Sequence, residues 1–179
     1  MAKQLKSGAS VPMKERPAIL AALNDVAASH AVDPAAIAGI IHTESVWDTT
    51  AVTGQYIGLT QVGPELPKKL GLTQNEFLAL SAGEQIDAYG VWLDYYKFAE
   101  KMKDHKIKCL ALPLARQAAV LQAMQFAPNG DNWKAALAAG DLTVRSTKSK
   151  QAEFLGDTSI GDMEAYYAGF FKKRPPVYA

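Results

Sequence analysis

The sequence is poor in cysteine, in excess charge and in long apolar runs, and each shortage excludes a class of protein. Cys109 is the only cysteine among 179 residues, so no intramolecular disulfide can form. Lys and Arg together number 19 and Asp and Glu 18, which gives a net charge of +1. This balance gives no reason to expect nucleic acid or an anionic membrane as a partner. No apolar run approaches the roughly 20 residues that a transmembrane helix needs, so we expect no membrane insertion.

We also expect no metal site and no cofactor. His30, His42 and His105 show no ligand spacing around Cys109, which speaks against a structural zinc site. Cys109 lies in the segment KIKCLALPL, a context that indicates a small buried hydrophobe rather than a nucleophile.

Helical start signals recur along the chain. Asp33 can accept hydrogen bonds from free amides and Pro34 suits a first helical turn, so we expect a helix from here to about Ser45. Thr73 with Glu76 has the spacing of a capping box, and a helix is predicted there. Further helices are predicted from Pro17, over PELPKKLG, from Ala82 to His105 after the capping-box pair Ser81 and Glu84, from Pro113 to Gln125, from Asp131 to about Gly140, and from Ile160 to Lys172.

Residues 46–64 interrupt the helical pattern. They contain four Thr and three Gly with no helical period, a composition that suits an extended loop or a short β-hairpin. Nothing repeats at a fixed period and no linker divides the chain. We therefore predict one mostly α-helical domain over residues 1–179, with irregular tails at 1–15 and 174–179.

Glu44 lies on a helical face that is otherwise apolar. Ile37, Ile40 and Ile41 precede it by seven, four and three residues, so all four side chains project from one side. Burial there would raise the pKa of Glu44, and the partial negative charge of the helix C-terminus acts in the same direction. Glycosidic cleavage needs such a protonated acid, because the leaving oxygen must receive a proton. The alternative, which periodicity alone favours, is a Glu that turns out to solvent at the helix end.

The residues after Glu44 resemble the signature of the soluble lytic transglycosylase and goose-type lysozyme superfamily. In that signature a Glu-Ser pair ends a helix, a polar loop with an early aromatic follows, and a Gly-Leu-Met-Gln turn closes the motif. The resemblance covers residues 36–64, one residue shorter than the commonest form, and EQIDAYGVWLDYY is similar to a later family helix. The matching residues are Glu44-Ser45, Trp47, Ala51, Thr53 and Gly58-Leu59-Thr60-Gln61.

The resemblance implies a lysozyme-like fold, with the loop or hairpin flanking an active-site cleft, and a lytic transglycosylase that cleaves peptidoglycan. Glu44 would protonate the oxygen that bridges N-acetylmuramic acid and N-acetylglucosamine. Its carboxylate would then deprotonate the muramyl 6-hydroxyl, which attacks C1 and leaves a 1,6-anhydro product. Microscopic reversibility lets one residue perform both steps.

Other residues of the motif would bind the glycan. Ser45 and Thr53 would hold the sugar or its N-acetyl group, with capping or hydrogen bonding within the loop as the alternative. Gln61 would bond across the loop toward the substrate and the catalytic carboxylate. Gly58 would let the backbone approach the sugar closely, and a turn with positive φ is a compatible explanation.

Two departures from the family pattern concern substrate binding. Thr60 replaces the usual Met, so an apolar contact with the sugar is lost or is supplied by Tyr56. The family's Ala-Tyr-Asn motif is not present as such, and LQAMQFAPNG stands at the expected place. There Gln125 could replace the Tyr or the Asn. The missing Tyr bears on substrate orientation more than on the acid/base step.

A hydrolase is the nearest competitor of the lyase. An inverting muramidase would need a second carboxylate roughly 6.5–9.5 Å from the first, and Asp48 and Glu65 are the candidates. Asp48 has the alternative role of forming a turn. We favour the mechanism with Glu44 as the single carboxylate.

Two further hypotheses stay open. A catalytically weak wall-binding or virion structural protein on the same scaffold would account for the altered third motif, and cleavage of chitin or chitosan uses the same sugar-binding logic. The start MAKQLKSGASVPMKERP shows no signal peptide. We therefore expect a phage endolysin, a virion-borne enzyme or an exported effector that acts in the periplasm or cell wall. Its expected partner is the glycan strand of peptidoglycan, and its expected state is a monomer.

Overall fold

The computed structural model describes residues 15–104, 106–126 and 160–173. The tails predicted at 1–15, apart from Glu15, and at 174–179 lie outside these ranges, as does the helix predicted from Asp131. The described elements are α1 (Arg16–His30), α2 (Pro34–Ser45), β1 (Val52–Thr53), β2 (Tyr56–Ile57), α3 (Glu65–Lys69), α4 (Gln74–Leu78), α5 (Ala82–Tyr95), α6 (Phe98–Asp104), the 3₁₀-helix η1 (Cys109–Ala111), α7 (Leu114–Phe126) and α10 (Ile160–Lys173).

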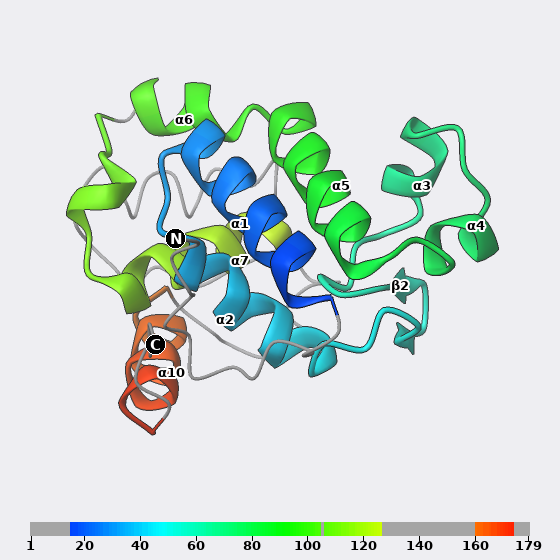
Figure 1. Cartoon of the computed structure of the whole chain (residues 1–179). Helices are drawn as coiled ribbons and strands as arrows, with labels where there is room; N and C mark the ends of the chain where they lie inside the picture. Colours follow the sequence, from blue (N-terminus) through cyan, green and yellow to red (C-terminus); the bar gives the residue numbers. More distant parts are fainter. Residues whose placement is uncertain (1–14, 105, 127–159, 174–179) are drawn as a thin grey trace.

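The predicted mostly α class with a short hairpin is confirmed. Helix α1 packs along α5, α2 packs against α7, and α10 covers α7 (Figure 1). The antiparallel pair β1–β2, with α3 and α4, lies on the side of the molecule away from α10 (Figure 1). Across the described ranges, no helix is long and apolar enough to cross a membrane.

Side-chain caps begin the helices where the sequence predicts them. Asp33 Oδ1 accepts from the Ala35 amide at 2.8 Å and so starts α2. Thr73 and Glu76 form a reciprocal capping box at α4, and Ser81 and Glu84 form another at α5. Each box satisfies backbone amides that a helix start leaves unpaired, which fixes where these helices begin.

The helix predicted over residues 82–105 is two helices. Helix α5 ends at Tyr95 and α6 begins at Phe98, because Lys97 adopts a left-handed φ of 57° that stops the helical hydrogen-bond ladder. In an unbroken helix Phe98 would point about 140° away from Leu93, five residues earlier. The break turns the Phe98 ring into the interior, where it is fully buried and lies 6.4 Å from the ring of His30.

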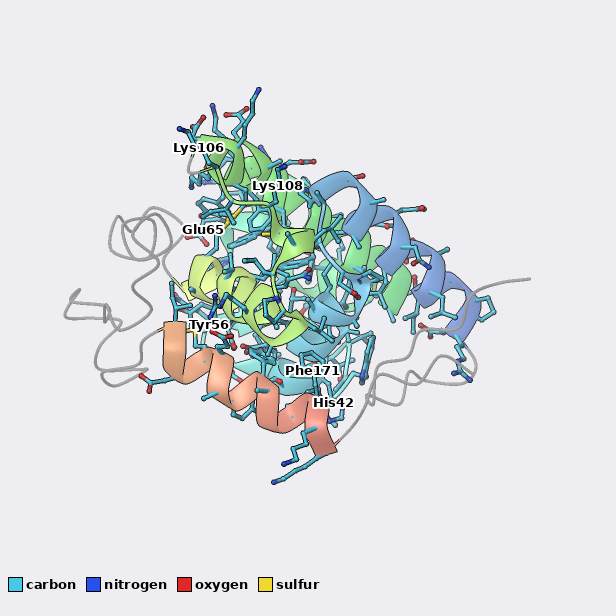
Figure 2. The ribbon with its side chains drawn as sticks, turned by 90° about the vertical axis from the view of Figure 1, so that its left-hand side faces the viewer. His42, Tyr56, Glu65, Lys106, Lys108 and Phe171 are labelled. Atoms are coloured by element: carbon cyan, nitrogen blue, oxygen red, sulfur yellow. The ribbon has the colours of Figure 1, made fainter. Side chains whose placement is uncertain are left out.

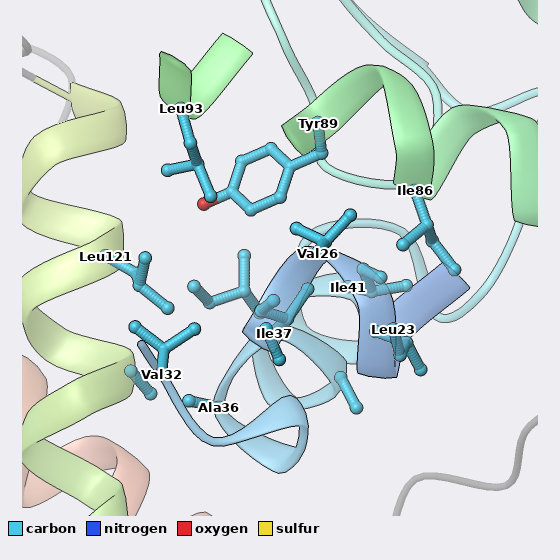
Figure 3. Close-up of a cluster of buried hydrophobic side chains, with 14 of the residues drawn as sticks. Leu23, Val26, Val32, Ala36, Ile37, Ile41, Ile86, Tyr89, Leu93 and Leu121 are labelled. Carbon is cyan, nitrogen blue, oxygen red and sulfur yellow. The ribbon is translucent and has the colours of Figure 1, made fainter. Parts of the chain in front are cut away.

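One apolar core joins α1, α2, α5 and α7. Ile37, Ile40 and Ile41 are fully buried in it, so the predicted apolar face of α2 is confirmed. Figure 3 shows the side chains that meet there, which include Val26 of α1, Ile37 and Ile41 of α2, Tyr89 and Leu93 of α5 and Leu121 of α7. This packing positions the C-terminal end of α2, where Glu44 lies.

Candidate active site

Glu44 stands in the last turn of α2, on the face formed by Ile37, Ile40 and Ile41. The residue is half-buried. Desolvation raises the pKa of its carboxyl above the ordinary value, and a hydrogen bond from Gln122 opposes this shift in part. Burial therefore favours the neutral acid relative to an exposed glutamate, and Gln122 supplies a hydrogen-bond donor to the ionised form.

Gln122 is the polar partner of Glu44. It projects from α7, and its Nε2 donates to Glu44 Oε1 at 2.7 Å. The sequence analysis did not single out Gln122. It lies three residues before Gln125, on the same side of α7, in the segment where the resemblance placed the altered third motif.

Two buried phenols lie close to Glu44. Tyr89 comes from α5 and Tyr167 from α10, and both are fully buried. Burial raises the pKa of both hydroxyls well above the ordinary value, and the negative charge of Glu44 raises it further. The surroundings of Glu44 are thus built by four helices, α2, α5, α7 and α10. Neither phenol was predicted, because tyrosines on helices distant in sequence carry no local signal of proximity.

The backbone directly after Glu44-Ser45 is strained. Val46 and Trp47 have φ values of 53° and 69°, in the left-handed region that β-branched and bulky residues avoid. Such conformations cost on the order of 1–3 kcal/mol each and cluster at functional sites. Here they reverse the chain at the end of α2 so that the Trp47 ring becomes buried in the core.

The Gly58–Gln61 turn is a closed loop. An antiparallel bridge between Ile57 and Val62, with hydrogen bonds of 3.0 and 3.1 Å, joins its ends. Gln61 Nε2 donates to the carbonyls of Gly58 at 2.9 Å and Ala51 at 3.2 Å. Both amide hydrogens of Gln61 are used within the loop. The expectation that Gln61 bonds toward the Glu44 carboxylate is therefore corrected, because Gln122 is the side chain that donates to this carboxyl.

Two further glutamines fasten this turn to the helices. Gln85 of α5 is buried, and its Oε1 accepts from the Leu59 amide at 2.9 Å. Gln125 of α7 donates from Nε2 to the Thr60 carbonyl. Gln125 therefore binds the backbone of the turn. The sequence analysis predicted that this residue could replace the Tyr or the Asn of the family's Ala-Tyr-Asn motif. Gln85 was missed, although it lies in the segment EQIDAYGVWLDYY that carries the second part of the resemblance.

Gly58 is required by the fold. Its φ is +73°, and a Cβ added there would lie 2.5 Å from Gln85 Oε1 and 2.9 Å from Cε1 of Phe77. The close approach that glycine permits is therefore to Gln85 and Phe77. Because Gly58 is buried, the prediction that its backbone approaches a sugar is corrected. The alternative explanation, a turn that needs positive φ, agrees with the structure.

The other predicted substrate-binding residues divide into buried and exposed. Ser45 is buried and its Oγ donates to the Ile41 carbonyl at 3.0 Å, which is the local bonding given as the alternative to a sugar contact. The Thr60 side chain is also buried, so a sugar would not reach it. Thr53 and Tyr56 are exposed and face each other as partners across the hairpin, so they are available to a ligand.

The two candidates for a second carboxylate are both exposed. Asp48 Oδ1 accepts from the Thr50 hydroxyl at 2.7 Å and from the Thr50 amide at 2.8 Å, and these bonds lower its pKa. This is the turn-forming role given as its alternative. Glu65 lies in the first turn of α3.

A small cavity of about 210 Å³ lies nearby between the hairpin and the α3–α4 region, lined by Gly54, Gln55, Ile57, Pro64, Pro67, Lys68, Leu72 and Gln74.

The described residues offer no centre for metal chemistry. His, Cys, Asp and Glu side chains form no cluster of three among them that could ligate an ion. Cys109 is buried, as predicted, and burial raises the pKa of its thiol to about 11, so it is a poor nucleophile.

No family model, curated protein or solved structure matches the chain, so the resemblance to lytic transglycosylases rests on the motif residues alone.

Proposed function

We propose that the protein is a peptidoglycan lytic transglycosylase in which Glu44 is the single general acid and base. The observation that carries the proposal is the half-buried Glu44 carboxyl with a raised pKa, at the end of an apolar helix face. A carboxyl whose pKa is raised by burial holds its proton to higher pH, which suits a group that must give a proton to a glycosidic oxygen. The strained Val46 and Trp47 that follow it support a functional rather than a merely structural position.

The proposed reaction needs only one proton carrier. Glu44 gives its proton to the oxygen between N-acetylmuramic acid and N-acetylglucosamine as the bond from C1 to that oxygen breaks. The resulting carboxylate takes the proton of the muramyl 6-hydroxyl as O6 bonds to C1. The products are a 1,6-anhydromuramyl end and a free 4-hydroxyl on the other fragment. No water is consumed, and Glu44 ends protonated as it began.

Gln122 would stabilise Glu44 while it is ionised, between the two proton transfers. Burial disfavours the Glu44 carboxylate, whereas the N–H from Gln122 stabilises it. The two influences on the Glu44 pKa oppose each other, and burial is the larger of the two. A group that must be acid in one step and base in the next needs such a balance.

The exposed hairpin is the proposed contact with the glycan. Thr53 and Tyr56 present a hydroxyl and an aromatic ring on its surface, groups that bind sugars by hydrogen bonding and by packing. A lyase is favoured over an inverting hydrolase because Asp48 is committed to its turn with Thr50. A muramidase that uses Glu65 as its base remains the alternative.

Digestion of purified murein sacculi, with mass spectrometry of the soluble products, tests the proposal. We expect 1,6-anhydromuropeptides from the wild type and release slower by roughly 10²–10⁴-fold from Glu44→Gln. The matched control is Glu100→Gln, since Glu100 is exposed on α6 and its ion pair within the described residues is with the exposed Lys97. Its activity should equal that of the wild type.

The products separate the competing functions. Muropeptides with reducing ends, together with inactivity of Glu65→Gln, would support a muramidase and contradict the lyase. Absence of release, with the wild type equal to Glu44→Gln, would contradict both enzymes. Co-sedimentation of that inactive protein with sacculi would then favour a wall-binding role. Parallel digestion of chitin oligomers shows whether the muramyl lactyl group is needed.

A further inference from the structure

A second cavity lies at the opposite end of α1 from the hairpin. It is about 660 Å³ and opens where the end of α1 meets α6, residues 106–108 and η1. Its volume is within the range of roughly 300–1,000 Å³ that is typical of small-molecule sites. Glu44 and the hairpin do not line it, so it forms a separate feature from the candidate active site.

The interior of this cavity is aliphatic. Met102 and Cys109 form buried parts of its lining, and Ile107 and Leu110 add branched side chains. Leu110 is 62% exposed, so its side chain is open to a ligand from solvent. No Phe, Tyr or Trp is among the described lining residues, and the one ring there is the imidazole of His30, whose two nitrogens bond the Val26 carbonyl and Asp94. Flexible aliphatic and thioether groups suit an alkyl chain.

The rim of the cavity is cationic. Lys103, Lys106 and Lys108 line it and are exposed, whereas the described lining contains no Asp or Glu. Figure 2 shows Lys106 and Lys108 at the α6 end of the molecule, away from α10. Three lysines gathered at one apolar cavity stand out in a chain whose net charge is +1. An apolar interior beneath such a rim is complementary to a ligand with one apolar end and one anionic end.

We propose that this cavity binds a single-chain fatty acid, with its alkyl chain against Met102 and Leu110 and its carboxylate at the lysine rim. The ordinary alternative is that the lysine stems merely cover apolar surface and bind nothing. The two differ in what they predict for the headgroup: only a site that recognises a fatty acid discriminates between an anion and a cation. The proposal is independent of any activity at Glu44.

The methionine methyl groups provide the test. The full chain is labelled with [¹³C-methyl]methionine and titrated with dodecanoate below its micellar concentration, with the Met102 resonance assigned through Met102→Leu. We expect a saturable shift of Met102. Met124, which is fully buried on α7, should not move and serves as an internal control. Dodecanol and dodecyltrimethylammonium should shift Met102 only at concentrations about tenfold higher or more.

Charge reversal at the rim provides the second measurement. Lys106→Glu with Lys108→Glu should weaken dodecanoate binding about tenfold, because two exposed attractions become repulsions. Lys172→Glu with Lys173→Glu, two exposed positions on α10, should leave it unchanged. The proposal is overturned if Met102 does not respond to dodecanoate or if the two double variants bind dodecanoate equally well. It is also overturned if dodecanol or dodecyltrimethylammonium binds as tightly as dodecanoate, or if dodecyl phosphate binds more tightly.

Discussion

The side-chain amide of Gln122 donates a 2.7 Å hydrogen bond to Oε1 of Glu44, across 78 residues of sequence. In a neutral carboxyl the carbonyl oxygen is the better hydrogen-bond acceptor. The bond from Gln122 to Oε1 therefore favours Oε2 as the oxygen that carries the proton. The bond also opposes the effect of burial on the Glu44 pKa, so the α2–α7 contact sets both the place of the proton and the ease of its release.

Replacement of Gln122 by Met should raise the Glu44 pKa. Met has a similar length but no donor, so the carboxylate loses a charge-assisted hydrogen bond and the acid form gains. The ¹³Cδ resonance of labelled Glu44, followed against pH, should show a midpoint at higher pH than that of the wild type.

Gln125→Met is the matched control for this titration. Gln125 lies one turn further along α7 and bonds the Thr60 carbonyl rather than Glu44. Its replacement should leave the Glu44 midpoint where it is. A midpoint that falls in Gln122→Met, or one that moves equally in both variants, would contradict the assigned role of Gln122.

Glu44 should make the folded protein less stable as the pH rises. The native pKa is raised above the unfolded value of 4.5, so between the two values the native state binds more protons than the unfolded state. The free energy of unfolding then falls as the pH increases through this window. Glu44→Gln, which cannot ionise, should gain in melting temperature relative to the wild type as the pH rises above 4.5.

Glu84→Gln should show the opposite dependence. Hydrogen bonds within the Ser81 capping box lower the pKa of Glu84, so its contribution to stability is present above pH 4.5 and is lost in acid. The loss of melting temperature in this variant should be largest near neutrality. Parallel curves for the two variants would show that burial of Glu44 does not govern its titration.

Val46→Gly should stabilise the protein. Val46 has a left-handed φ of 53° and is 70% exposed, so the change relieves strain with little loss of buried surface. Strain relief of about 1–2 kcal/mol exceeds the entropic cost of glycine, and a net gain of about 0.5–1 kcal/mol corresponds to roughly 1–4 °C in melting temperature.

Val52→Gly is the control for the Val46 prediction. Val52 is also exposed but lies in β1 and has no positive φ. Glycine there should cost about 0.5–1 kcal/mol. Thermal melts followed by circular dichroism would decide the matter, and destabilisation in both variants would mean that Val46 is not strained.

Gly58→Ala and Gly54→Ala form a pair that separates packing from backbone conformation. Both glycines have positive φ, +73° and +63°, but only at Gly58 would a Cβ meet neighbours below 3.0 Å. We expect a loss of about 1 kcal/mol for Gly54→Ala from the backbone alone. Gly58→Ala should lose about 2–4 kcal/mol, because it also displaces Gln85 from the turn. Urea unfolding measures both, and equal losses would contradict the packing argument.

The sequence by itself determined the elements whose physical causes are local. Asp33, Ser81 and Thr73 begin their helices because each side chain satisfies amides two or three residues away. The apolar face of α2 follows from the three- and four-residue spacing of Ile37, Ile40 and Ile41. These relations span a few residues, so periodicity and capping chemistry suffice to predict them.

Tertiary structure alone decided which side chains surround that carboxyl. Gln122 bonds Glu44 from a helix far along the chain, and Tyr167 of α10 lies near enough for the charge of Glu44 to raise its pKa. Gln61, which belongs to the same motif as Glu44, bonds within its own loop instead. The break at Lys97 has the same origin, since it places Phe98 in a core that α1 and α5 build together. A hydrogen bond or a buried ring is chosen by the partner that packing brings within reach, and the order of residues along the chain does not specify that partner.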